Sequence, residues 1–522
     1  MPSPPLPSLS LGFEFEGWLV TQYKDIDGPV QGRDDLPSSE TESLKGQIAK
    51  TNFDKNNPAP FDWNPNKGRM PSVPTGNKLL TDVLNVVTGA LKTSKLKDSV
   101  LAGSEVSEEH PDLTVHKKYN IVRERGTEQN LEGEVDFKKN PSRRDSQVLD
   151  QQCYFIGFEF RPRIYEDVRD KYQSIWDELG SVLKELTKRF PISVNAGNDV
   201  WFRLPDSIPS ETRVVRGESR SGLHIHVGAK GVFEHLEPSL RQKPQVLKAE
   251  MVPRILAIKK LLTLYWLVEP NLKTLHASWR SEDARYSGLL RTHSNLAFHP
   301  DVKKEAKVGE TPIQHWFHEK EKILLLHQKP FYSLEDFNKT NDGPSDKSII
   351  GRLRAKLGDR VTKHGWAAIE IIWSTTNMDQ LAWLASSYFG NRRSSLNLHQ
   401  LLPPGTRFDG GSVRVEEKRT GTLEFRLMQG SFDTDAIAAW TDVVLKMTEV
   451  CLAESQDAFV NFVDGVVEKP GHVVSGDKTK AFIERLGLDE KSYAYKFYSD
   501  ERQGKLDLEA DPRHHIFVPQ GR

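Results

Sequence analysis

The strongest constraint on the fold of this chain is a stretch near its start, GFEFEGWLV, which alternates as a β-strand does. Alternation places Phe13 and Phe15 on one face and Glu14 and Glu16 on the other, with the two carboxylates roughly 6.5–7 Å apart along the strand. An exposed strand can carry two glutamates for solubility alone. A functional role becomes the better interpretation because three later segments show the same alternation of ionisable and apolar side chains.

These later strands are CYFIGFEFRPRIY, SGLHIHVG and TGTLEFRLMQGSFD, and each places ionisable side chains opposite apolar ones. If the apolar faces pack against helices, the polar faces would line one concave surface. That surface would carry Glu14, Glu16, Glu159, His224, His226, Glu424 and Arg426.

Several carboxylates in one place raise each other's pKa, and a bound cation removes that cost. Carboxylate oxygens with an occasional imidazole favour Mg²⁺ or Mn²⁺ over a closed structural zinc site. Each motif alone has a plainer interpretation. HxH occurs by accident as well as in zinc hydrolases, and Glu-Phe-Arg is common as a cross-strand ion pair.

Composition excludes several classes of partner. The 72 basic and 73 acidic residues give a formal charge of −1, which predicts neither nucleic acid nor an anionic membrane as a partner.

Cys153 and Cys451 lack a CxxC or paired spacing and fit a reducing compartment. The start, MPSPPLPSLS, is unlike a signal peptide, and no apolar run reaches about 18 residues. We therefore expect a cytoplasmic protein.

Composition also divides the chain. Pro, Gly, Ser and charge predict long polar insertions at about 27–110 and 300–359 within one domain of residues 1–470, followed by a charged extension, 471–522. Apolar spacing predicts helices at about 77–91, 168–186, 253–275 and 434–451, and strands at 367–373 and near Leu396. The last of these helices would be capped by Asp433 or Thr434.

The succession GFEFE, GFEFRPRIY, SGLHIHVG, NRRSSLNL and GTLEFRLMQGSFD resembles the amidoligase family, whose members typically read GLHVHVG and TIEFRxHxGTxD in the corresponding blocks. This family belongs to the glutamine synthetase-like carboxylate–amine ligases, together with the glutamate–cysteine ligases. The resemblance covers most of the chain in discontinuous blocks. It implies an α+β, glutamine synthetase-like catalytic fold: a curved, mostly antiparallel sheet forming an open half-barrel, with helices on its outer face and long loop insertions.

The resemblance also implies roles for individual residues. Glu16 and Glu159 would hold one cation, and Glu14, His224 and Glu424 the other. Further roles would fall to His226 facing phosphates or an acidic substrate, Arg426 stabilising the phosphoryl group, Arg280 and Arg291 binding anions, and Asn397 orienting substrate or a metal ligand.

Two departures from the family pattern affect these roles. Arg161-Pro162 stands where members have a Ser-Pro turn, which puts the substrate contact at that edge in question. The family's Trp-x-Val-x-x-Asp strand has only YNIVRERGTE as a counterpart, so Glu124, Glu128 or neither would support a metal there.

The resemblance implies an ATP- and Mg²⁺-dependent ligase that joins a small-molecule carboxylate to an amine through an acyl phosphate. Such a site needs positioning, metals and an arginine, and no Ser or Cys nucleophile. Two alternatives remain open from the sequence: a metal-dependent amidase or other hydrolase using the same cleft, and a catalytically silent member that binds nucleotide or a partner. The identity of the substrates and the oligomeric state are not determined by the sequence.

Overall fold

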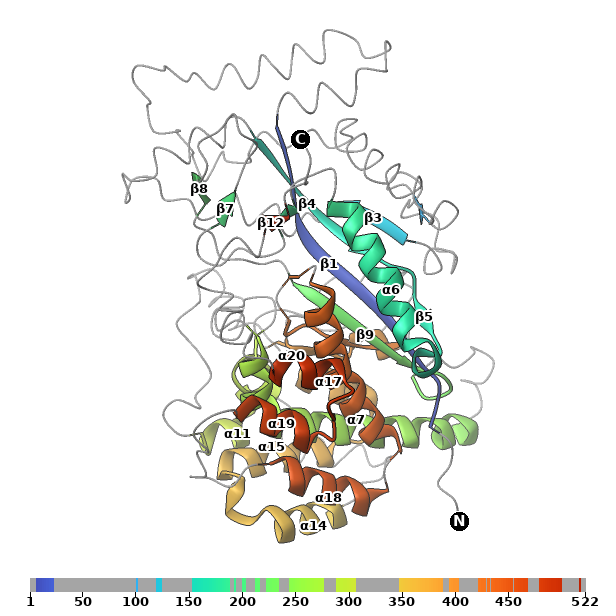
Figure 1. Ribbon diagram of the computed structural model, residues 1–522. Helices are drawn as coiled ribbons and strands as arrows, with labels where there is room; N and C mark the ends of the chain where they lie inside the picture. The colour runs from blue at the N-terminus through green and yellow to red at the C-terminus, as the bar shows by residue number, and fades with distance from the viewer. Residues whose placement is uncertain are drawn as a thin grey trace. The chain divides into compact units, whose positions relative to one another are not determined.

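A computed structural model gives the structure of the chain (Figure 1). It describes residues 6–22, 100–101, 119–123, 153–187, 192–193, 200–202, 212–215, 222–233, 244–276, 288–306, 347–387, 394–402, 421–428, 430–431, 433–453, 455–467, 478–499 and 516–517. Within these ranges no helix combines the length and the apolar character needed to cross a lipid bilayer.

The architecture is α+β, with a mostly antiparallel sheet that is not closed into a barrel within the described residues, as the sequence predicts at this level. The chain divides into two compact units. Unit 1 comprises Met1–Glu14, Ile164–Glu178 and Gly222–Asp507, and unit 2 comprises Phe15–Arg163, Leu179–Ser221 and Leu508–Arg522. Strand β1 (Leu9–Gln22) contributes its first half to unit 1 and its second half to unit 2.

In unit 1 the strand order is β10 (Leu396–Asn397), β11 (Thr422–Phe425), β9 (Leu223–Ala229) and β1, with β5 (Tyr165–Glu166) pairing the start of β1. Each interior strand is short and rich in β-branched or aromatic residues, which favours the pleated conformation. The registers between β10 and β11 and between β11 and β9 are antiparallel. Period-two alternation along these strands therefore sends every second side chain to the same face.

The apolar side chains of this sheet are buried in the core of unit 1. Leu11, Ile225 and Phe425 are fully buried, and the Phe425 ring lies 6.3 Å from the ring of Tyr265 on α7 (Pro244–Leu272). Helix α17 (Thr434–Ala453) contacts both α7 and β9. The sheet thus buries one face against helices, which leaves the opposite face for the polar groups.

The remaining helices of unit 1 pack around α7 and α17, and their bounds are as follows: α9 (Leu290–His293), α10 (Asn295–Phe298), α11 (Pro300–Lys304), α14 (Lys347–Leu357), α15 (Lys363–Ser374), α16 (Met378–Ala385), α18 (Gln456–Val466), α19 (Lys478–Arg485) and α20 (Tyr493–Ser499), with 3-10 turns η4 (Lys273–Leu275), η5 (Gly358–Arg360) and η6 (His399–Leu401). Helix α6 (Val168–Thr187) begins in unit 1, where Trp176 packs edge-on against Phe13 with ring centroids 5.9 Å apart.

In unit 2 the second half of β1 pairs antiparallel with β4 (Cys153–Arg161), and β4 pairs antiparallel with β3 (Tyr119–Arg123). The other strands of this unit are β2 (Val100–Leu101), which runs parallel to β3, β6 (Ile192–Ser193), β12 (Ile516–Phe517) and the separate pair β7 (Val200–Phe202) and β8 (Thr212–Val215).

Two elements differ from the sequence prediction. Residues 367–373 form part of helix α15, so the predicted strand there is wrong. Thr362 caps this helix by accepting a hydrogen bond from Gly365 N, and most of the circumference of the helix is buried, which hides the helical period of the sequence. Helix α7 begins at Pro244, so Pro253 lies inside it and not near its start. A proline inside a helix costs about 3 kcal/mol of helix stability, and burial of the apolar side chains that follow Pro253 on α7 offsets this cost.

Other predicted elements are confirmed. Helix α6 matches the predicted helix, and Asp433 caps α17 because its Oδ1 accepts hydrogen bonds from Asp435 N and Ala436 N. The predicted helix at 77–91 lies outside the described residues, as does most of each predicted insertion. In the charged extension, residues 478–485 form α19 and residues 493–499 form α20, and α20 packs on α17 in unit 1.

Candidate metal centre

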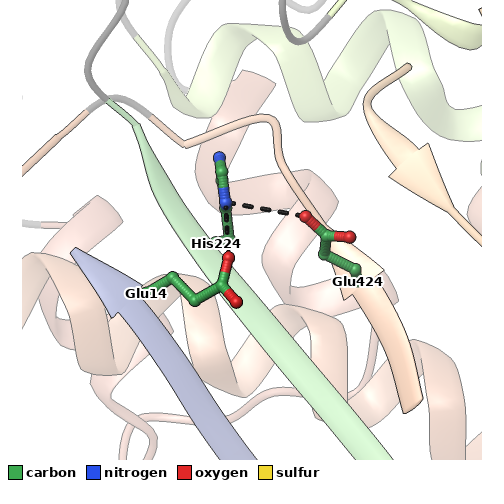
Figure 2. Close-up of side chains that lie close together, drawn as sticks. All are labelled: Glu14, His224 and Glu424. Atoms are coloured by element: carbon green, nitrogen blue, oxygen red, sulfur yellow. Dashed lines mark hydrogen bonds and ion pairs between the residues drawn. The ribbon is translucent and has the colours of Figure 1, made fainter. Parts of the chain in front are cut away.

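Three side chains from three neighbouring strands of unit 1 converge. Glu14 comes from β1, His224 from β9 and Glu424 from β11, and Figure 2 shows them pointing toward one another. One ligand atom from each lies within 4.8 Å of the others. The sequence separates these residues by 200 positions or more, so only the strand order β11–β9–β1 brings them together.

One nitrogen of the His224 ring faces both carboxylates. Nδ1 lies 3.1 Å from Glu14 Oε2 and 3.5 Å from Glu424 Oε1. Adjacent ligands of an octahedral Mg²⁺ lie about 3.0 Å apart, since each bond to the ion is about 2.0–2.1 Å. The two distances from His224 Nδ1 are therefore close to that spacing, and all three ligand atoms lie within 4.8 Å of one another.

A row of polar side chains crosses the sheet beside this group. Glu424 lies directly opposite His226 on β9 and opposite Asn397 on β10. Asn397 Nδ2 donates to Glu424 Oε2 at 2.5 Å, and Glu14 Oε1 lies 3.3 Å from His226 Nε2. Thr422 completes the row, because its Oγ1 lies 3.2 Å from His226 Nδ1.

Arg426 supplies the positive charge of the site. Its Nη1 donates to Glu424 Oε1 and lies 3.3 Å from His224 Nδ1. Burial alone would raise the pKa of Glu424, but the charges of Arg426 and the two histidines together hold that pKa below its ordinary value. Glu424, only 3% exposed, is therefore ionised at neutral pH and available as a ligand.

The charge of Glu14 acts on His226. Burial lowers the pKa of His226, but the charge of Glu14 and the hydrogen bond between the two more than offset burial and raise the pKa above its ordinary value. The carboxylates of the site therefore favour the protonated form of His226, and they would favour a divalent cation for the same electrostatic reason. Two carboxylates and an imidazole are suitable ligands for Mg²⁺, Mn²⁺ or Zn²⁺.

The second predicted pair, Glu16 and Glu159, lies in unit 2. The two residues are direct cross-strand partners on β1 and β4, so their Cβ atoms are about 4.5–5.5 Å apart and their side chains share a face. Arg161 Nε donates to Glu159 Oε1. Within the described part of the chain, Glu14, His224 and Glu424 are the one group of three His, Cys, Asp or Glu ligands, so no third residue of these types joins the Glu16–Glu159 pair there.

Of the two predicted anion-binding arginines, only Arg291 belongs to the described residues. Arg280 lies outside the described residues, as do the acidic candidates Glu124 and Glu128. Arg291 donates its backbone N–H to Glu269 Oε2 at 2.8 Å, and its guanidinium carbon lies 5.8 Å from the centre of the Trp266 ring.

The sequence analysis did not single out two polar residues: Thr422, which contacts His226, and Glu269, which accepts hydrogen bonds from Leu290, Arg291 and Ser395. Thr422 stands two positions before Glu424, so strand alternation alone would have placed it on the same face. Glu269 is the one charged residue of the helix segment YWLVEPNL, and a lone carboxylate in such a largely apolar segment could have drawn attention to it. Comparison of the chain with known protein families, with characterised proteins and with solved structures found no match.

Proposed function

We propose that this protein is an ATP- and Mg²⁺-dependent carboxylate–amine ligase with a glutamine synthetase-like catalytic fold. The observation that carries the proposal is the Glu14–His224–Glu424 group, with Arg426 on Glu424. The motifs that resemble the amidoligase family supply these four residues. The small-molecule substrates would be a carboxylate and an amine, and the finer form of the fold, an open half-barrel, belongs to this proposal as well.

Each of the polar residues on these strands would have a defined task. Glu14, His224 and Glu424 would hold one cation, and Glu16 with Glu159 would contribute to a second. When bound, Mg²⁺ supplies a Lewis acid that neutralises phosphate oxygens. Arg426 would stabilise the charge that develops on the transferred phosphoryl group, and His226 would donate a hydrogen bond to a phosphate or acidic group. Asn397 would keep Glu424 oriented through its 2.5 Å hydrogen bond.

The chemistry follows from that set of groups. A carboxylate reacts poorly with amines until one oxygen is phosphorylated, because oxide is a poor leaving group. Transfer of the γ-phosphoryl group of ATP would give an acyl phosphate and ADP. Attack by the amine would then form the amide and release phosphate. Arg426 and the cation ligands would serve the first step by positioning and charge stabilisation.

The test is ADP release by the purified protein with Mg²⁺-ATP and pools of amino acids, short peptides and polyamines, with hydroxylamine as a second nucleophile. A ligase should form one ADP for each amide or hydroxamate, since hydroxylamine competes with the amine for the acyl phosphate. Glu424→Gln should abolish both products. Glu370→Gln, which alters a half-exposed glutamate paired with Arg354 on α15 and α14, should leave them unchanged.

A different result would identify the alternatives. Amide cleavage without ATP, lost in Glu424→Gln, would establish a metal-dependent hydrolase and exclude the ligase. Nucleotide binding without turnover of any substrate pool would indicate a catalytically silent protein that binds nucleotide.

A further inference from the structure

Glu269 is a fully buried carboxylate on helix α7, away from the candidate metal ligands in sequence, and every hydrogen bond that the structure gives it comes from another segment. Its Oε1 accepts from Leu290 N at 2.6 Å and from Ser395 Oγ at 2.8 Å. Its Oε2 accepts from Arg291 N at 2.8 Å. A buried charge is costly unless such donors surround it, so the carboxylate fixes both segments to α7.

The two segments that Glu269 holds are also joined to each other. Ser395 N donates to Gly288 O at 2.8 Å, and Gly288 and Ser394 form a parallel bridge. The result is a junction of three chain segments, 288–291, 394–395 and the end of α7. Because Ser395 bonds through both its side chain and its backbone N–H, its position is determined from two sides.

Ser395 connects this junction to the candidate metal centre. Its carbonyl oxygen accepts a hydrogen bond from Arg426 N at 2.8 Å. Two residues further along, Asn397 lies opposite Glu424 and donates to it. The strand that Glu269 anchors therefore sets the backbone of Arg426 and the amide that orients Glu424.

From these contacts we infer that Glu269 is a positioning residue for the candidate metal centre, acting through Ser395 on Arg426 and through Asn397 on Glu424. The inference deepens the proposed function and rests on it for its metal readout. Glu269 touches none of the groups proposed to react. Its task is to keep the β10 edge of the site in register.

The decisive variant is Glu269→Gln. A glutamine keeps the size of the side chain but replaces one acceptor oxygen by an NH₂ group. Because both oxygens of Glu269 accept hydrogen bonds, either orientation of the amide sets N–H against at least one donor. Ser395→Ala is the milder second variant, since it removes one donor and leaves the backbone hydrogen bonds in place.

Asp442→Asn is the matched control. Asp442 is also a buried carboxylate of unit 1, and it accepts hydrogen bonds from Tyr172 OH and from Ala494 N at 2.9 Å. It lies on α17 and joins α20, and it makes none of these contacts to β10. General loss of stability should therefore affect Asp442→Asn and Glu269→Gln alike, whereas positioning should distinguish them.

Two measurements on the full chain test the inference. Hydrogen exchange followed by mass spectrometry reports the amides of peptides covering 394–402 and 421–428, and calorimetry with Mn²⁺ alone reports the affinity of the metal centre. Glu269→Gln should increase exchange in both peptides and weaken Mn²⁺ binding about tenfold, the low end of the effect of losing a direct partner of a metal ligand, because Glu269 acts one contact further from the ligands. Ser395→Ala should change the exchange of both peptides and the Mn²⁺ affinity in the same direction, but by less. Asp442→Asn should change neither the exchange of these peptides nor the Mn²⁺ affinity.

Contrary outcomes are equally clear. A folded Glu269→Gln protein with wild-type exchange or wild-type Mn²⁺ affinity overturns the inference, and so does an Asp442→Asn protein with the same changes. If Glu269→Gln does not fold, unchanged exchange and affinity in Ser395→Ala overturn it. If the wild-type protein binds no Mn²⁺, the proposed metal centre fails, and the exchange measurement still decides whether Glu269 fixes β10.

Discussion

The side-chain amide of Asn397 donates from Nδ2 to Glu424 Oε2 at 2.5 Å, while its Oδ1 accepts the backbone N–H of His399 at 3.0 Å. Both ends of the amide are therefore committed, which fixes its orientation. Glu424 in turn has one oxygen toward Asn397 and the other toward Arg426 and His224. Asn397 thus selects which carboxylate oxygen faces the candidate cation.

Asn397→Asp tests this selection. The substitution sets a second carboxylate oxygen against Glu424 Oε2, and two adjacent buried acceptors oblige one of them to bind a proton. We expect Mn²⁺ affinity, measured by calorimetry, to fall by about 10–100-fold. Asn377→Asp is the control, because Asn377 caps α16 through Oδ1 and aspartate caps a helix equally well. Equal Mn²⁺ affinity in wild-type and Asn397→Asp proteins would contradict the role of Asn397.

Titration of His226 should make the free energy of unfolding depend on pH. Its pKa is raised in the folded protein, because the charge of Glu14 outweighs burial. The resulting stability is fully present below the unfolded pKa of 6.5 and is lost as pH rises through the folded pKa. In urea unfolding with a chelator present, the free energy difference between wild-type and His226→Gln proteins should therefore shrink as pH rises above 6.5.

His293→Gln should show the opposite pH dependence of the free energy difference from wild type in the same assay. Burial lowers the pKa of His293 to about 4, so its contribution is present above 6.5 and is lost as pH falls toward 4. A His226→Gln difference that stays constant from pH 6 to pH 9 would show that Glu14 and His226 are not coupled as the structure has them.

Gly288 lies where the chain passes close to a ring. A Cβ atom added at this position would meet the His293 ring, with Cγ at 2.4 Å. Gly288→Ala should therefore destabilise the protein by about 1–3 kcal/mol, the usual cost of overpacking. Gly351→Ala on α14, where a Cβ meets nothing within 4 Å, should instead stabilise it by about 0.5–1 kcal/mol. Chemical denaturation of both variants measures this difference, and equal effects would exclude the close approach.

The charged segment after residue 470 contributes to the core of unit 1. Phe482, Ile483 and Leu486 are buried, and Tyr493 packs edge-on against Tyr172 and Trp176. Ile483→Ala should cost about 2–5 kcal/mol in thermal or chemical unfolding, whereas Glu484→Ala on the exposed side of α19 should change stability by less than about 0.5 kcal/mol. No loss in Ile483→Ala would mean that the segment folds separately from unit 1.

Local sequence patterns predicted the strands that carry the site, since alternation over four to nine residues specifies both a strand and its two faces. The same reasoning failed at 367–373, because a short run that is apolar on nearly every side has no visible period. It also divided the chain at residue 470 on charge, although Ile483 and Tyr498 of that segment are buried.

The sequence by itself determined that Glu14, His224 and Glu424 stand on the polar faces of strands and that a helix begins at Asp433 or Thr434. Tertiary structure alone decided that β11, β9 and β1 are neighbours, that Asn397 lies opposite Glu424, and that Glu269 accepts a hydrogen bond from Ser395, just before β10. The reason is physical. Alternation is a local property of the backbone, whereas strand order and the partners of a buried carboxylate depend on how distant segments pack.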